Sequence, residues 1–161
     1  MLTSKETLLS LFICQLIFYS VYYVVSSIAF AICGLDSFTG TNPFNFKSWV
    51  DFESCCSYSK EQIVNTVSMY VTYPVTGVIF GMFISSWVWD FSVTTSLLHI
   101  ALSCLVMLDF PKDWSWWVSL GTSVLLMIGC GEGMSALRRW RNKSRLVVPE
   151  QQLEPTTYMC K

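Results

Sequence analysis

The fold class is decided by the stretch from Ser86 to Trp117, which reads SWVWDFSVTTSLLHIALSCLVMLDFPKDWSWW. Its centre, residues 91–108, has no formal charge between Asp90 and Asp109. As an α-helix these residues extend roughly 27 Å, at about 1.5 Å per residue, close to the core of a thin bilayer. Tryptophans, which prefer the headgroup level, flank the run at positions 87, 89, 114, 116 and 117. We therefore predict a transmembrane helix here.

The rest of the chain has the composition of a membrane protein. Hydrophobic residues make up 53% of its 161 residues and charged residues only 13%, which is too apolar for a typical soluble domain. The charges are grouped, with long uncharged runs between them. With a net charge of −1 and no basic face, the sequence gives no indication of nucleic-acid binding. We expect one domain embedded in the lipid bilayer.

Uncharged runs predict four spans, at about residues 8–32, 63–86, 91–108 and 114–131. The run at 7–35 is too long for a signal peptide, so we expect an uncleaved span. In the second run Pro74 predicts a kink, and the spacing of Gly77 and Gly81 allows another helix to approach closely. The short link 109–113 returns the fourth helix antiparallel to the third. The predicted fold is therefore an all-α membrane protein with four transmembrane helices.

The basic residues predict the orientation of these helices. Half of the ten Lys and Arg residues lie in a ten-residue cluster after the fourth span, at positions 138, 139, 141, 143 and 145. The positive-inside rule then places both termini in the cytosol and the loop 36–61 in the lumen or outside. Basic residues next to a span also attract anionic lipid. We interpret 1–137 as a four-span membrane domain, and 138–161 as a basic juxtamembrane segment followed by a disordered cytosolic tail.

The loop 36–61 is expected to lie in water and, because it is rich in aromatic residues, against the membrane surface. The aromatic residues that suggest this are Phe44, Phe46, Trp49 and Phe52.

One face of the third predicted helix carries a polar stripe through the membrane. It consists of the single histidine and the hydroxyl residues at helical spacing around it, namely Ser92, Thr95, Ser96, His99 and Ser103. The structural hypothesis is a seam between helices held by hydrogen bonds. The functional hypothesis is a proton relay or ligand site.

Two carboxylates are expected at the cytosolic boundary of the hairpin formed by the third and fourth helices. Folding about Pro111 places Glu132 opposite Asp90, since each lies twenty-one residues from the proline. Asp90 also suits a helix N-terminus, where a carboxylate faces the positive end of the helix dipole. Arg138 and Arg139 are positioned to neutralise Glu132. The two acids form either an interfacial ion cluster or an acidic docking point for a cytosolic partner.

The sequence supports no catalytic, cofactor-binding or metal site. No nucleophile–base–orienter set, phosphate-binding loop or H-E-x-x-H motif is present. Seven cysteines occur without a C-x-x-C, which argues against a zinc ribbon or a thioredoxin-like site. We therefore predict that the protein is not an enzyme.

Several motifs, in order and spacing, resemble the SYS family of Golgi integral membrane proteins. They are Val21-Tyr22-Tyr23, Asp90, Phe91, Val93, Thr94, His99, Phe110, Pro111, Trp116, Trp117, Gly131 and Glu132. The resemblance implies a four-span protein of the Golgi and trans-Golgi network. Family members act as receptors that recruit an ARF-related small GTPase through its acetylated amino terminus. That GTPase acts upstream of an Arf-like GTPase and GRIP-domain golgins in vesicle traffic.

Two functions therefore follow from the sequence. The first is a trafficking adaptor that recruits an ARF-related small GTPase, with Asp90 and Glu132 as the candidate docking residues. The alternative is a proton-linked small transporter or channel that uses His99 and Glu132. The scarcity of ionisable groups at mid-membrane depth favours the adaptor.

Overall fold

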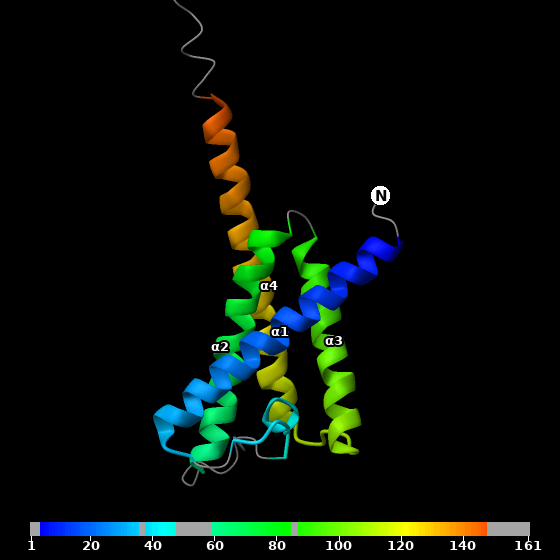
Figure 1. Ribbon diagram of the computed structural model, residues 1–161, viewed down its shortest axis with the longest axis vertical. Helices are drawn as coiled ribbons and strands as arrows, with labels where there is room; N and C mark the ends of the chain where they lie inside the picture. The colour runs from blue at the N-terminus through cyan, green and yellow to red at the C-terminus, as the bar shows by residue number, and fades with distance from the viewer. Residues whose placement is uncertain (1–3, 36–37, 48–58, 85–86, 148–161) are drawn as a thin grey trace, which may run out of the picture.

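A computed structural model describes residues 4–35, 38–47, 59–84 and 87–147, and every element in these ranges is a helix (Figure 1). The elements are α1 (Ser4–Cys33), the short 3₁₀ helix η1 (Asn42–Phe44), α2 (Lys60–Phe83), α3 (Val88–Met107) and α4 (Trp114–Val147). Four of them are long and apolar enough to cross a membrane. The predicted all-α fold with four transmembrane helices is confirmed.

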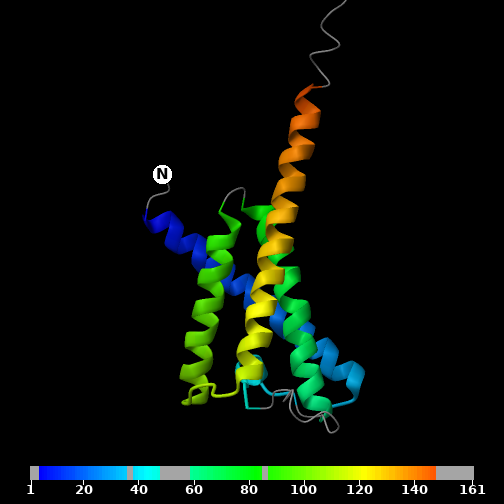
Figure 2. The same cartoon turned by 180° about the vertical axis from the view of Figure 1, so that it is seen from behind.

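The four long helices form one bundle in which α1 is the most inclined. Figures 1 and 2 show α1 running diagonally across the other three helices. The start of α1, the end of α2, the start of α3 and the end of α4 lie at one end of the bundle. The short helix η1 and the link between α3 and α4 lie at the other end.

The closest helix pair is α2 with α4, which run parallel and have the most extensive contacts in the bundle (Figure 2). A methyl group built on Gly77 would overlap the carbonyl oxygen of Met127, and one on Gly81 would overlap that of Gly131. One on Gly131 would lie 2.7 Å from Cγ1 of Val88. The predicted close approach at Gly77 and Gly81 is confirmed, because only hydrogen fits between the two backbones.

The helix boundaries differ from those of the predicted spans, and α2 ends at Phe83, three residues earlier than expected. The first three begin three or four residues earlier than expected, and in α1 and α2 polar residues form the added turn. In α2 the hydroxyl of Ser59 accepts a hydrogen bond from the backbone N–H of Gln62, and the Gln62 side chain accepts one from Ser59. This capping box starts the helix in polar sequence. α2 then continues through Pro74 to Phe83.

α4 shows the largest difference from expectation, because it continues from residue 131, where the predicted span ends, to Val147. Charge ends a transmembrane run but does not end a helix. Residues 134–147 contain neither Gly nor Pro and include several strong helix formers.

The described part of the first loop packs into the bundle, so its expected position against the membrane surface is wrong for two of the four aromatic residues. Phe46 is 3% exposed, with its ring centroid 6.1 Å from that of Trp116. Phe44 contacts the rings of Tyr19 and His99, at 5.3 and 6.0 Å. These rings bury more apolar area inside the bundle than they would at a headgroup surface. Trp49 and Phe52 lie outside the described residues.

Candidate functional site

His99 lies in the centre of the bundle, inside a cluster of aromatic rings. Its side chain is 2% exposed. Rings from three other elements surround it, with centroids 5.4–6.5 Å from the imidazole, namely Phe18, Tyr19, Tyr22, Phe44 and Tyr73. The hydroxyl of Tyr19 lies 3.4 Å from Nδ1 of His99. This polar contact links α1 to α3 at the point where α1 crosses the bundle.

All five residues of the predicted polar stripe on α3 face the interior. Ser92, Thr95, Ser96, His99 and Ser103 are each no more than 4% exposed. Two of the hydroxyls bond their own helix: Ser92 donates to the carbonyl oxygen of Val88 at 2.9 Å, and Ser96 to that of Ser92 at 2.8 Å. The hydroxyls of Thr95 and Ser103 have no hydrogen-bond partner among the residues that the structure describes. The contact between His99 and Tyr19 connects this stripe to α1.

We expect His99→Phe to cost about 0.6–2 kcal/mol of unfolding free energy, the range for a hydrogen bond between transmembrane helices. Phenylalanine keeps the ring packing and removes only the contact with Tyr19. Tyr19→Phe removes the same contact from the other side. The two losses should therefore not add in the double variant, as measured by denaturant titration in micelles. Fully additive losses would show that His99 does not act through Tyr19.

Glu132 completes the start of α3. The N-cap residue of this helix, Trp87, has a left-handed backbone (φ 64°) and offers no capping side chain. A carboxylate oxygen of Glu132, from α4, instead accepts a hydrogen bond from the backbone N–H of Trp89 at 3.4 Å. Asp90, the next residue, is exposed at the same helix end. The hairpin therefore brings Glu132 beside residues 89–90, as the count about Pro111 suggested.

Arg138 donates its hydrogen bonds to the end of α2 rather than to the carboxylate of Glu132. Its guanidinium donates hydrogen bonds to the carbonyl oxygens of Gly81, at 3.4 Å, and of Met82. These carbonyls belong to the last turn of α2, where the helix dipole is negative. α4 thus presents an acid to the N-terminus of α3 and a base to the C-terminus of α2. Sequence reasoning missed this arrangement because it treated Glu132 and Arg138 as partners of each other.

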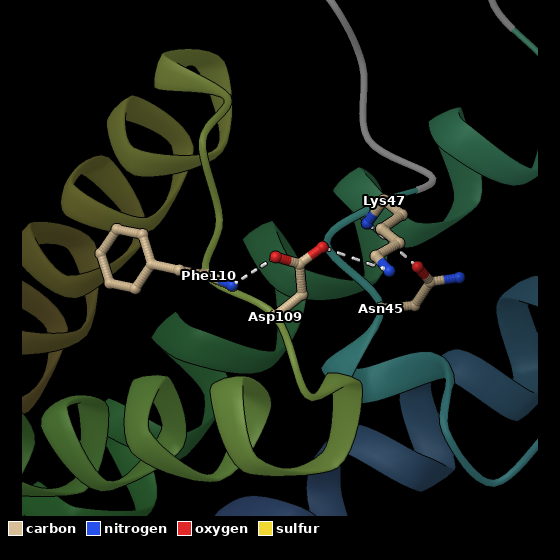
Figure 3. A network of polar contacts seen from close by, with 4 residues as sticks. All are labelled: Asn45, Lys47, Asp109 and Phe110. Atoms are coloured by element: carbon tan, nitrogen blue, oxygen red, sulfur yellow. Dashed lines mark hydrogen bonds and ion pairs between the residues drawn. The ribbon is translucent and has the colours of Figure 1, made fainter.

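The opposite end of the bundle has its own polar contacts, shown in Figure 3. Lys47, from the first loop, lies 3.4 Å from Asp109, which follows α3. The other oxygen of Asp109 accepts a hydrogen bond from the backbone N–H of Phe110 at 2.9 Å. The Phe110 amide, and then Lys47, hold the pKa of Asp109 below its usual value. No local pattern predicts this link, since the two charges lie sixty-two residues apart.

Metal ligands are not gathered in the described ranges, which contain no group of three or more His, Cys, Asp or Glu side chains able to hold an ion. The cysteines described are unpaired, at positions 14, 33, 104 and 130. Cys55 and Cys56 lie outside the described residues.

Comparison with known proteins identifies the family. The sequence matches, over residues 5–144, the SYS1 family described as "Integral membrane protein S linking to the trans Golgi network". The chain belongs to this family. It is also 36% identical over 127 residues to human "Putative transmembrane protein 244", an alignment that covers 77% of this chain and 93% of that protein. No solved structure is significantly similar to this chain.

The predicted resemblance to the SYS family is thereby confirmed. The family match extends past Arg138 to residue 144 and so includes part of the basic segment that continues α4. The match also covers His99, Asp90 and Glu132. As a SYS1 family member, the chain is an integral membrane protein of a Golgi-linked family.

Proposed function

We propose that this protein is a non-enzymatic membrane adaptor of the Golgi and trans-Golgi network that recruits an ARF-related small GTPase. Such recruitment serves protein localisation to the Golgi and vesicle transport from the Golgi to endosomes or the plasma membrane. The observation that carries the proposal is the match to the SYS1 family over residues 5–144. The GTPase partner follows from the family resemblance described above.

The arrangement of the two ends supports this proposal. The end that carries Asp90, Glu132 and the basic segment of α4 also holds the start of α1 (Figures 1 and 2). The positive-inside rule assigns this end to the cytosol, which is where small GTPases bind their effectors. An acidic surface at residues 90 and 132 is therefore available on the side that the partner approaches.

A transporter is the second candidate, because the interior holds His99 together with several buried hydroxyls that have no hydrogen-bond partner among the described residues. Besides those of Thr95 and Ser103, they include the hydroxyls of Thr72 and Thr76 on α2. A proton path also needs groups that can carry charge. In the described interior the buried polar side chains are Ser, Thr, Asn and His, and Glu132 lies at the end of α3. Stacked aromatic rings, rather than carboxylates, are the direct neighbours of His99, which favours the adaptor.

The test is capture of an ARF-related GTPase by the full-length protein from Golgi membranes. We expect capture in the GTP-bound state and a roughly tenfold loss, about 1.4 kcal/mol, when Asp90→Asn and Glu132→Gln are combined. Glutamine keeps an oxygen that can accept from Trp89, so the start of α3 stays bonded. Asp109→Asn, at the other end of the bundle, is the matched control and should leave capture unchanged.

Different results would separate the parts of this proposal. If the unmodified protein captures no such GTPase, the adaptor function is wrong. If the double variant captures it normally, the acidic docking point is wrong but the adaptor function stands. Proton flux in reconstituted vesicles that disappears in His99→Gln, with folding unchanged, would support the transporter instead.

A further inference from the structure

The last turns of α4 extend beyond the other helices of the bundle (Figures 1 and 2). Where α2 ends, Arg138 of α4 donates hydrogen bonds to the last turn of α2. Beyond it, Arg139, Arg141 and Lys143 are exposed basic residues, and we call these three the basic collar. We infer that the basic collar is a binding site for the anionic phospholipid headgroups of the bilayer that the chain spans.

The depth of the collar matches the headgroup layer. α4 starts at Trp114, a residue type that prefers the interface. From there about 20 helical residues, at about 1.5 Å each, cross a hydrocarbon core of about 30 Å and reach Met134. The polar layer adds about 5–8 Å on each side, which is the next three to five residues. Arg139 therefore falls at the outer edge of the headgroup layer. Arg141 and Lys143 follow about 3 and 6 Å further out, where their long side chains can reach back to the lipid phosphates.

The collar surrounds the helix rather than occupying one face. At about 100° per residue, Arg141 points roughly 200° away from Arg139, while Lys143 lies near Arg139. A docked protein covers one side of a helix, but headgroups surround a helix that leaves a bilayer. The distribution of charge therefore fits lipid better than a protein surface, and it complements the negative phosphates.

Exposed apolar side chains accompany the collar. Trp140 is 67% exposed and Leu137 is 56% exposed, although both lie next to basic residues. Trp140 and Leu137 are three residues apart and share one face of α4. Tryptophan between arginines at this depth is an arrangement typical of the membrane interface, where its ring has an apolar body and a polar N–H. The same lipid layer accounts for the charges and for the exposed tryptophan.

The experiment measures which lipids stay bound to the purified full-length protein. The protein is equilibrated with mixed micelles of phosphatidylcholine and phosphatidylserine, and the bound lipids are counted by mass spectrometry. We expect phosphatidylserine to be enriched over phosphatidylcholine. Lys143→Gln should lower this enrichment about fivefold at low ionic strength, the usual contribution of one basic residue near an anionic surface. Raising the salt concentration should weaken the enrichment in the unmodified protein.

The matched control is Lys112→Gln, at the opposite end of the bundle. Lys112 stands between Asp109 and Asp113, so its surroundings are close to neutral and the substitution should change lipid binding little. The triple variant Arg139→Gln/Arg141→Gln/Lys143→Gln should lose most of the enrichment of phosphatidylserine. Its unfolding free energy should stay the same as that of the unmodified protein. Equal enrichment in the triple variant and the unmodified protein would overturn the inference. The assay contains no GTPase, so its result does not depend on the proposed function.

Discussion

Gly77→Val is expected to destabilise the bundle by about 3 kcal/mol, at the upper end of the usual cost of overpacking. The reason is that the nearest obstacle is backbone: any side chain at this position meets the carbonyl oxygen of Met127 on α4. A flexible side chain could move aside, but two packed helices can only separate. The measurement is the unfolding free energy in detergent micelles, and loss of the contact between α2 and α4 should appear as a shifted transition.

The control for this prediction is a glycine in the same helix pair that faces open space. A methyl group on Gly129 of α4 would meet no atom within 4 Å. Gly129→Ala should therefore be neutral or stabilise by up to about 1 kcal/mol, because alanine is the better helix former. Gly77→Ala should be destabilising. If both alanine variants have the same stability, the close approach of α2 and α4 is wrong.

The helices were predictable from the sequence because their chemistry is periodic and local. Long uncharged runs bounded by Trp and charge can hardly be anything but spans, and the polar face around His99 follows from helical spacing alone. Which helices pack against each other was harder to predict from the sequence. Gly77 and Gly81 indicated a close contact, but in an apolar run nothing distinguishes α4 from α3 as its partner. Gly131, which completes the contact, was noted only as part of a family motif.

The remaining differences share a physical cause, which is that the deciding contacts are distant in sequence. Phe44 and Phe46 were assigned to the membrane surface because aromatic rings suit that layer as well as they suit a core. The space for them exists only once α1, α3 and α4 are assembled. Lys47 and Asp109 meet for the same reason. Local rules describe each segment correctly, but they do not say which surfaces the bundle leaves for a loop to fill.

The second large effect is expected from exchanging the charges of Glu132 and Arg138. In the structure each of them caps a different helix: Glu132 accepts from Trp89 at the start of α3, and Arg138 donates to Gly81 and Met82 at the end of α2. Neutralising either one, as Glu132→Gln or Arg138→Gln, should cost about 1 kcal/mol, the usual contribution of a charge at a helix end. The two losses should add, because the residues act on separate helices.

The exchanged variant Glu132→Arg/Arg138→Glu distinguishes this arrangement from the ion pair that the sequence suggested. If the two side chains paired with each other, exchanging them would restore the pair and most of the stability. As helix caps they cannot be exchanged, because arginine would then face the positive end of α3 and glutamate the negative end of α2. Repulsion then adds to the two lost hydrogen bonds, so we expect a loss of about 3 kcal/mol, larger than for either neutral variant. Unfolding free energies of the four variants, measured in the same micelles, decide between the two arrangements. If the exchanged variant recovers the unfolding free energy, Glu132 and Arg138 bind each other. If its unfolding free energy falls below that of either neutral variant, α4 holds α2 and α3 together through the opposite charges of the two helix ends that it contacts.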